Sequence, residues 1–341
     1  MTKRRWLAAL LFRTGALGLL KTVLRDRVVV LNYHRIRPDG EALPTLFADD
    51  VYGPTTAQFE EQVVWLKQHT RVLSEAELID GVRNGRGPGE MSVVITSDDA
   101  YRDNYTRAYP ILRKHGVPAI FFAPSELIDA RRVGWWDELA YILKRTAKRQ
   151  IVYGGRTLDL TLRRQEAFQF IKQDVIKAMS RTTSNPLGQL AQACAVDPPS
   201  HQEQDNELMT WEQLKEVREH RIGVGSHAHR HLVLSRLTAE QQRDELTRSR
   251  ALIEARIGGT VRSLAYPTCG RADFSQETQR LAKESGYEIG FSFYSGYNRW
   301  PTMDAFDIRR TEVTYHDRIG VAGVAILPEL LAFPIAPVSE Q

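Results

Sequence analysis

Short apolar runs alternate with amphipathic stretches along most of this chain, a pattern typical of strands covered by helices. The clearest apolar runs predict buried strands at 27–34, 91–96, 117–123 and 222–226. Weaker runs predict further strands at 71–73, 263–267, 289–293 and 308–313. Because helical patterns separate most of these strands, the sheet is expected to be parallel. We therefore predict an α/β fold: a deformed or incomplete (β/α) barrel of about seven parallel strands.

Apolar residues at helical spacing predict helices at 58–69, 74–82, 109–115, 238–257 and 275–285. Thr56 is a candidate cap for the first of them, and Gly116 ends the third. Residues from about 125 to 210 show strand-like rhythm only at 150–153 and 157–160. We interpret this region as a mostly helical insertion with a small hairpin, within one domain that covers 27–320. A tail at 321–341 follows.

The first 26 residues predict a basic amphipathic helix. Lys3, Arg4 and Arg5 precede an apolar stretch that Arg13 interrupts, and the stretch is too short to span a bilayer. Residues 1–25 could lie on a membrane surface or pack on the body of the protein. The two cysteines in 341 residues form no disulfide framework. We predict a cytoplasmic location, with membrane association as an alternative and export less favoured.

The overall composition is that of an ordinary soluble globular protein, with 42% hydrophobic and 26% charged residues. The net charge of +4 is small, and no basic stripe is interleaved with aromatic residues. Nucleic acid is therefore not an expected partner.

Polar side chains follow two of the predicted strands and suggest a metal site. Asp98 and Asp99 end one apolar run, and His227 and His231 follow another. Because active sites of α/β barrels lie at the carboxyl ends of the strands, we expect these groups to meet. One carboxylate and two imidazoles can bind a divalent metal and leave room for water and substrate. The second carboxylate is then free to act as a base, which predicts a metal-dependent hydrolase.

A third segment, 264–270, reads as a strand that enters a loop with Pro267 and Gly270. Its backbone N–H groups could face the site and stabilise an oxyanion. His229 lies between the two candidate ligands and either points elsewhere or competes for the metal.

These segments together resemble the polysaccharide deacetylases of carbohydrate esterase family 4, which carry the NodB-type domain. The family motif Thr-Phe-Asp-Asp-Gly corresponds to Thr96-Ser97-Asp98-Asp99-Ala100, and the motif His/Ser-His-Thr-x-x-His corresponds to 226–231. The segment 264–270 is similar to Phe-Ala-Tyr-Pro-Tyr-Gly with one residue inserted. The opening strand near 31–36 and the region 286–310 are similar to exopolysaccharide-associated members. The resemblance covers about residues 27–315.

The resemblance implies roles for single residues. Asp98 would be the general base that activates a metal-bound water, and the backbone N–H of Thr268 would help to bind the oxyanion. Asp99, His227 and His231 would hold the divalent metal, which is usually zinc in the family and sometimes cobalt or another ion. The substrate would be an N-acetylated glycan or a lipid-linked saccharide.

Three departures from the family pattern bear on activity. Ser97 replaces Phe, Ala100 replaces Gly, and Ala265 occupies the place of the Arg that pairs with the base in many members. If the backbone at Ala100 has a positive φ, its side chain adds strain. Arg309 or Arg310 could supply the missing cation, and Arg309 is the one we assign to the site.

The sequence does not decide the roles of some other groups. No late Leu-x-His motif supplies a general acid, and the position of His316 is unconvincing. Tyr266 and the pair Trp135-Trp136 could contact sugar, or they could be buried aromatic residues of the core; Tyr266 is included among the substrate-binding candidates. The alternative functions are hydrolysis of another amide or imide on the same fold, and glycan binding by a catalytically weak homologue.

Overall fold

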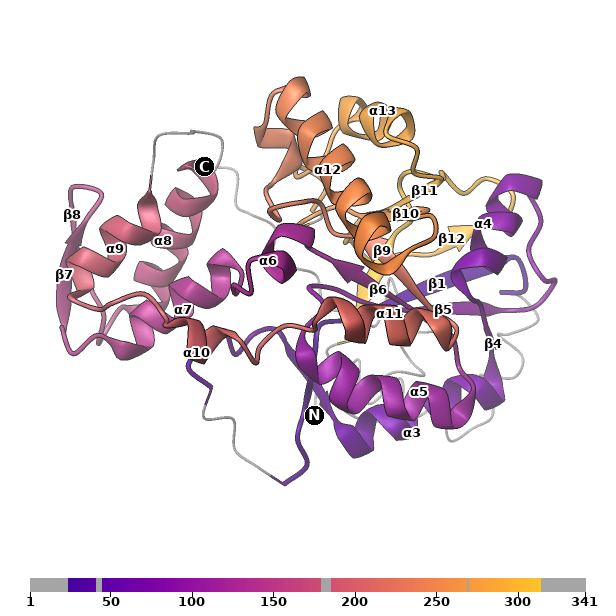
Figure 1. The fold of residues 1–341 in the computed structure, drawn as a ribbon, viewed down its shortest axis with the longest axis horizontal. Helices are drawn as coiled ribbons and strands as arrows, with labels where there is room; N and C mark the ends of the chain where they lie inside the picture. Colours follow the sequence, from indigo (N-terminus) through magenta and orange to yellow (C-terminus); the bar gives the residue numbers. More distant parts are fainter. Residues whose placement is uncertain (1–23, 41–44, 179–184, 269, 314–341) are drawn as a thin grey trace.

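Figure 1 shows the computed structural model, which describes residues 24–40, 45–178, 185–268 and 270–313. Its main body is a curled, mostly parallel sheet whose strands run in the order β11-β10-β9-β6-β5-β1-β12, with β4 beside β5 and β13 beside β1. The strands are β1 (Arg27–Tyr33), β4 (Arg71–Val72), β5 (Ser92–Ser97), β6 (Ala119–Ala123), β9 (Ile222–Ser226), β10 (Ser263–Ala265), β11 (Ile289–Phe291), β12 (Asn298–Arg299) and β13 (Arg310–Glu312). The fold class predicted from the sequence is confirmed.

The last strand segment brings the two ends of the sheet together. Ile308 and Phe291 form a parallel bridge, and the N–H of Ser292 donates to the Ile308 carbonyl oxygen at 3.0 Å. Two residues further on, β13 pairs with β1 in parallel, with Val30 opposite Arg310. The segment therefore touches both β11 and β1, and it carries Arg310 into the interior.

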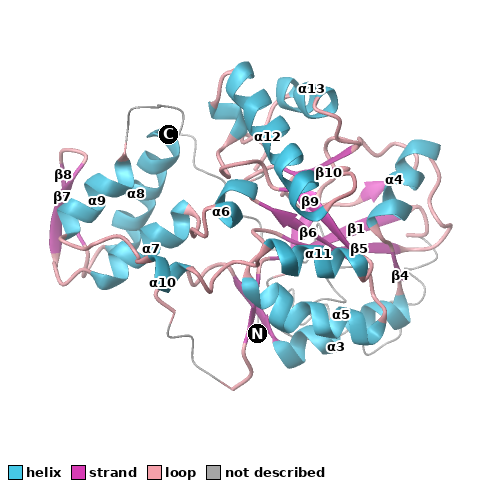
Figure 2. Ribbon diagram, viewed as in Figure 1, coloured by secondary structure: helices cyan, strands magenta, loops and turns pink. Residues whose placement is uncertain are grey.

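Helices cover the outer face of the sheet, as Figure 2 shows. They are α3 (Thr56–His69), α4 (Glu75–Asn84), the π-helix η1 (Asn104–Ala108), α5 (Tyr109–His115), α11 (Trp211–Glu219), the short η2 (Leu234–Arg236), α12 (Ala239–Ile257) and α13 (Gln276–Glu284). A small parallel pair, β2 (Arg35–Arg37) and β3 (Tyr52–Thr55), lies apart from the main sheet. The cap of α3 is Thr55, not Thr56, because the Thr55 hydroxyl accepts from the Gln58 N–H in a capping box.

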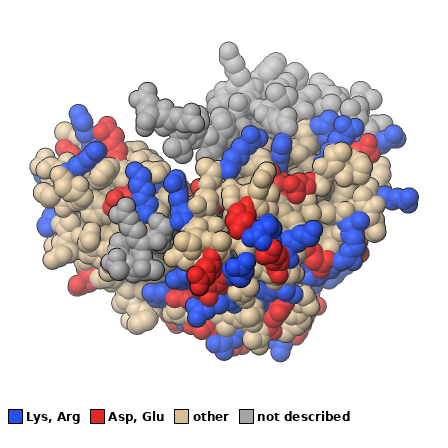
Figure 3. Space-filling model, turned by 90° about the horizontal axis from the view of Figure 1, so that it is seen from above, with Lys and Arg blue, Asp and Glu red and all other residues tan. Residues whose placement is uncertain are grey.

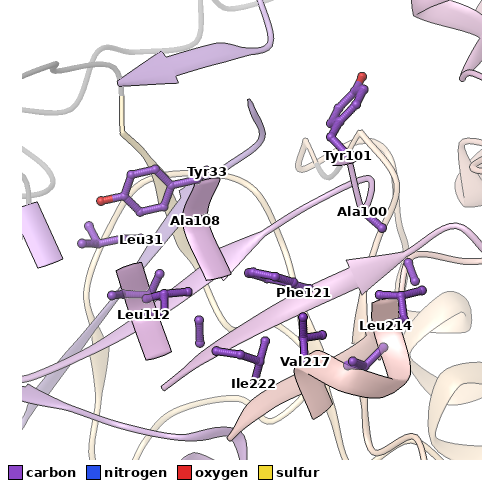
Figure 4. Packing of buried hydrophobic residues seen from close by; sticks show 14 of the residues in the cluster. Leu31, Tyr33, Ala100, Tyr101, Ala108, Leu112, Phe121, Leu214, Val217 and Ile222 are labelled. Carbon is purple, nitrogen blue, oxygen red and sulfur yellow. The ribbon is translucent and has the colours of Figure 1, made fainter. Parts of the chain in front are cut away.

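The strands divide the core into two layers because side chains alternate between the faces of a sheet. Val28, Val30 and Val94 belong to a cluster inside the curl of the sheet. Their neighbours in sequence face the helices instead and form the largest cluster, part of which appears in Figure 4. There Phe121 of β6 lies on the same side of the sheet as Leu214 and Val217 of α11. Because these runs are apolar at successive positions, each strand contributes side chains to both layers.

Residues 125–210 contain the helices and the hairpin expected there. The elements are α6 (Ser125–Asp129), α7 (Trp135–Arg145), β7 (Gln150–Tyr153), β8 (Arg156–Asp159), α8 (Arg164–Ala178), α9 (Pro186–Cys194) and α10 (His201–Gln204). They hold a separate apolar cluster, with Ile142, Ile171 and Leu190 fully buried. In Figure 1, α6 lies between these helices and α12, so it joins the insertion to the barrel.

Two expectations fall outside the described residues: the basic helix at the N-terminus, of which only 24–26 are described, and the tail at 321–341. Among the helices that the structure describes, none is both long and apolar enough to cross a bilayer. Basic and acidic side chains are interspersed over the described part of the face in Figure 3.

Candidate active site

The predicted meeting of the two polar segments occurs at the carboxyl ends of β5 and β9. Asp98 follows β5 directly, and its N–H donates to the Tyr33 carbonyl oxygen at 3.0 Å. His227 follows β9, and its N–H donates to the Ala123 carbonyl oxygen at 2.9 Å. Each segment is thus held by the end of a neighbouring strand, which places the side chains on the same rim of the barrel.

Asp99, His227 and His231 form a candidate metal centre. One ligand atom from each lies within 4.8 Å of the others, and all three residues are buried. The Asp99 Oδ1 is 3.7 Å from the His227 Nε2 and 3.4 Å from the His231 Nε2. This oxygen is also buried without a hydrogen-bond partner among the described residues. A buried carboxylate oxygen that faces two imidazoles fits a divalent cation, so the residues fit the group that the family resemblance implies.

The surroundings of His227 fix its tautomer and keep it neutral, as metal binding requires. Its Nδ1 is 2.8 Å from the Ala265 carbonyl oxygen, which can only accept, so the proton lies on Nδ1 and the Nε2 lone pair faces the site. Burial lowers the pKa of His227 to about 4 and lowers that of His231 well below its ordinary value. Both imidazoles are therefore neutral near pH 7, as ligands must be.

The loop 227–231 is tightly turned and not helical. Ala228 and His231 have φ values of 58° and 57°, which bring the rings of the two ligands to 4.6 Å between centroids. The fully buried Glu245 of α12 accepts from the N–H groups of His229 and Arg230 at 3.1 and 2.8 Å. His229 turns away to Ser125, at 2.9 Å, and does not compete for the metal. Glu245, which the sequence did not reveal, holds the loop.

Asp98 is paired with Arg310, one of the two arginines named from the sequence. The Arg310 Nη1 and Nη2 donate to the two Asp98 oxygens at 2.6 and 2.9 Å, and the Asn32 Nδ2 donates at 3.1 Å. Burial by itself would raise the pKa of Asp98, but Arg310, His227 and His34 outweigh it and lower this pKa below its ordinary value. The carboxylate stays ionised at neutral pH, which a base requires.

Asp99 has the opposite electrostatic environment. Burial, then the neighbouring charges of Asp98 and Asp137, raise its pKa well above the ordinary value. The pKa values of the two adjacent buried carboxyl groups are thus shifted in opposite directions, and a bound cation would favour the ionised form of Asp99.

Two site assignments need correction. Tyr266 is fully buried, its hydroxyl donates to the Phe306 carbonyl oxygen at 2.9 Å, and its ring stacks on Phe274, so it is a core residue and cannot contact substrate. Arg309 does not reach Asp98: its guanidinium lies over the Tyr294 ring, 5.4 Å from the centroid. Successive residues of a strand point to opposite faces, so only one of the two arginines can enter the barrel.

The departures at Ser97, Ala100 and Ala265 have distinct consequences. The Ser97 hydroxyl ties the end of β5 to Asn104 of η1 at 2.5 Å. Ala100 has a φ of 50°, so the strain expected from its side chain is present. The arginine missing at Ala265 is replaced in space by Arg310. Thr268 has a φ of 56° and is half-buried in the loop after β10.

Aromatic residues of the insertion form one wall of the site. The Trp136 ring lies 4.3 Å from the His231 ring, and its indole N–H donates to the Tyr101 hydroxyl at 2.7 Å. That hydroxyl donates to the fully buried Asp137 at 2.8 Å. Figure 4 shows Tyr101 at the edge of the core cluster, with its hydroxyl directed away from Phe121. The sequence marked Trp135, Trp136 and Asp137 as a cluster, and the structure adds the hydrogen bonds that join Trp136 and Asp137 to Tyr101.

His34, at the end of β1, also reaches the site. Its Nε2 is 3.9 Å from the Asp98 Oδ2, and its side chain is 19% exposed, whereas those of Asp98 and His227 are 3% and 2% exposed. It is therefore the titratable group beside the base with the most access to solvent. Its position as the last residue of the first predicted strand, 27–34, was the signal that could have revealed it.

Comparisons with known proteins identify the family of this chain. Residues 85–290, more than half of the chain, match the family model described as "Polysaccharide deacetylase". The chain belongs to the polysaccharide deacetylase family. This membership supports hydrolysis of N-acetyl groups on glycans as its class of activity. The match includes Asp98, Asp99, His227 and His231, but it ends before Arg310.

The chain is also similar to individual proteins and to solved structures. The chain is 24% identical over 280 residues to the "Putative polysaccharide deacetylase YxkH" of Bacillus subtilis, covering 81% of this chain and 68% of that protein. It is 32% identical over 105 residues to a poly-beta-1,6-N-acetyl-D-glucosamine N-deacetylase of Staphylococcus epidermidis, covering 29% and 36% of the two chains. The structure of IcaB from Ammonifex degensii shares the fold, with a TM-score of 0.55, 19% identity, and 88% and 96% coverage.

Proposed function

We propose that the protein is a metal-dependent N-deacetylase of a glycan or a lipid-linked saccharide, and that Asp98 is its general base. One observation carries the proposal: an ionised, buried carboxylate lies beside a three-ligand candidate metal centre. The Asp98 Oδ2 is 3.8 Å from the His227 Nε2, so a water molecule near the centre would also be near the base.

When bound, a divalent cation, for which we propose zinc, supplies a Lewis acid that polarises the acetyl carbonyl group and acidifies water. Asp98 accepts a proton from the attacking water. Arg310 and Asn32 hold the carboxylate in place through hydrogen bonds to its oxygens. We assign the stabilisation of the oxyanion to the backbone N–H of Thr268. Acetate and a free amino sugar are the products.

We assign the general acid to His34, because its imidazole lies 3.9 Å from the base and its side chain is partly exposed to solvent. A protonated His34 would donate to the leaving amine nitrogen. His34→Gln is expected to lower kcat by about 100-fold, because general acid catalysis contributes on that scale, and to leave metal content unchanged. Steady-state rates and elemental analysis test this. A variant with wild-type kcat would contradict the assignment.

The protein loaded with zinc is expected to release acetate from partially N-acetylated β-1,6-linked glucosamine oligomers. The choice of oligomer follows the name of the staphylococcal relative. Acetate is measured enzymatically, before and after chelation, and metal content by elemental analysis. His231→Ala removes one of the candidate ligands and is expected to lose both the metal and the activity.

The outcomes separate the alternatives. A metal-loaded protein that releases no acetate from any N-acetylated oligomer would shift the function to another amide or to glycan binding. A protein that retains no metal after loading would contradict the metal centre itself.

A further inference from the structure

The two candidate histidine ligands are held in different ways. The Nδ1 of His227 faces the Ala265 carbonyl oxygen at 2.8 Å, which is the usual arrangement for a histidine that binds a metal. The Nδ1 of His231 is buried, and it has no hydrogen-bond partner on another residue in the described part of the chain. The orientation of the His231 ring therefore depends on what packs against it.

Trp136 supplies this packing from outside the centre. Its ring lies 4.3 Å from the His231 ring, between centroids, at an interplanar angle of 52°. The His227 ring is a second aromatic neighbour of His231, at 4.6 Å. Because His227 is itself a candidate ligand, Trp136 is the one of these two neighbours that can brace His231 independently of a cation.

A buried chain of hydrogen bonds holds Trp136 in turn. Its indole N–H donates to the Tyr101 hydroxyl at 2.7 Å, and this hydroxyl donates to Asp137 at 2.8 Å. Asp137 is fully buried, and its other oxygen accepts from the Ala48 N–H at 3.0 Å. The Arg35 guanidinium lies over the Tyr101 ring, 4.4 Å from the centroid. Each donor and acceptor in this chain has a partner, and a fully satisfied buried network is rigid.

This chain connects two segments that carry candidate ligands. Tyr101 lies two residues after Asp99, whereas Trp136 belongs to α7 of the insertion and contacts His231. The bond between indole and hydroxyl thus ties the segment of one ligand to the ring of another, across 35 positions of the sequence. Ligands that are held in place before a cation arrives bind it more tightly, because less freedom is lost on binding.

We infer that Trp136 is a positioning residue for His231, and that Tyr101 and Asp137 hold its indole in place through hydrogen bonds. The inference rests on the proposed function in one respect, which is that His231 binds a cation. The insertion thus strengthens cation binding in the barrel, although its own residues supply none of the three candidate ligands.

The test measures zinc affinity of the full-length protein by competition with a chelator, which needs no turnover. Tyr101→Phe keeps the ring but removes the hydroxyl that joins Trp136 to Asp137. It is expected to weaken zinc binding by about ten-fold, because loss of a group that orients a metal ligand costs about 10–100-fold in affinity. Tyr141→Phe is the matched control and is expected to leave the affinity unchanged. Tyr141 is also buried on α7, but its hydroxyl donates to Glu203 at 2.9 Å.

Two further variants test the same chain at its other members. Trp136→Phe keeps an aromatic ring but cannot donate to Tyr101, and it is expected to weaken zinc binding as well. If Tyr101 acts through Trp136, the double variant should lose no more affinity than the larger of the two single losses. Asp137→Asn can still accept from the Ala48 N–H, but its NH2 group would face the Tyr101 hydroxyl, so its affinity should also fall. Circular dichroism shows whether each variant is folded, and Trp136→Phe carries the test if Tyr101→Phe is not.

NMR of the metal-free protein with isotope-labelled histidine gives a second readout. The signals of the His231 ring are assigned by their loss in His231→Ala. They should move in Tyr101→Phe, because the indole ring above the imidazole is displaced, and stay in place in Tyr141→Phe.

The two readouts separate this inference from the proposed function. If the wild type binds zinc, unchanged affinity in both Tyr101→Phe and Trp136→Phe would overturn the positioning role and leave the metal centre standing. Additive losses in the double variant would also overturn it. If the wild type binds no zinc, the proposed function is contradicted, and NMR decides the inference: shifted His231 signals in Tyr101→Phe would support the positioning role, and unshifted signals would overturn it.

Discussion

Asp98→Asn is expected to lower the rate of acetate release by about a thousand-fold, because removal of a general base costs about 10²–10⁴ in rate. Asparagine keeps the shape of the side chain, and with its oxygen at the position of Oδ2 it can still accept from the Arg310 Nη2 and the Asn32 Nδ2. Its amide NH2 group would face the Arg310 Nη1 donor, and the side chain cannot take a proton from water. The three candidate metal ligands are untouched, so bound metal should stay at the wild-type level. Initial rates and elemental analysis on the same preparation separate the two properties.

Two results would contradict the roles assigned to Asp98 and Asp99. Asp98→Asn that keeps more than about a tenth of the wild-type rate would assign the base elsewhere. If the variant loses its metal together with its activity, Asp98 would be a ligand, and the division of labour between Asp98 and Asp99 would be wrong.

Arg310→Met is expected to destabilise the protein by about 3–5 kcal/mol, because it leaves the buried Asp98 without its counter-ion. Arg310 is fully buried and contacts both oxygens of that carboxylate. Methionine keeps much of the apolar volume, so the loss reports on the charge. Denaturant unfolding at pH 7 measures it, and Arg309→Ala is the matched control. Arg309 is only half-buried and lies on Tyr294, so its removal should cost less than about 1 kcal/mol.

The same variant should change the pH dependence of activity. In the wild type the pKa of Asp98 is lowered because Arg310, with His227 and His34, outweighs burial. Without Arg310, burial acts with less opposition and the pKa rises, so the carboxylate becomes protonated at a higher pH. The acid limb of the pH–rate profile should therefore move to higher pH in Arg310→Met and stay in place in Arg309→Ala. An unmoved acid limb in Arg310→Met would contradict the pairing.

The pairing also predicts how acid affects stability. A carboxyl group whose pKa is lower in the folded protein stabilises it above the unfolded pKa, which is 3.8 for Asp. This contribution is lost as the pH falls below that value. Arg310→Met should lack most of it, so the difference in unfolding free energy between the wild type and the variant should narrow below about pH 4.

Local patterns in the sequence determined most of the strands and the main residues of the candidate site. The runs at 27–34 and 222–226 predicted β1 and β9 closely, because a buried parallel strand must be apolar on both faces. Asp98, Asp99, His227 and His231 were recognisable because motif spacing and strand ends are local properties. That these segments meet followed from the rule that parallel strands place their carboxyl ends on one rim.

Tertiary structure decided which of the neighbouring side chains enter the site. Arg309 and Arg310 are chemically identical in the sequence, and only the register of β13 against β1 directs Arg310 to Asp98. Tyr266 was a candidate for either sugar contact or the core, and its position directly after β10 places it in the core. A strand shifted by one residue exchanges its two faces, and composition carries no information about that register.

The remaining site residues come from parts of the chain that are distant in sequence. His34 and Trp136 reach the centre only because β1 lies beside β5 and because the insertion packs against the loop of His231. The sequence by itself therefore determined the chemistry of the centre, since ligands and base sit in short motifs. The tertiary structure decided the cation that keeps the base ionised, the candidate acid and the aromatic wall at Trp136, because these depend on long-range packing.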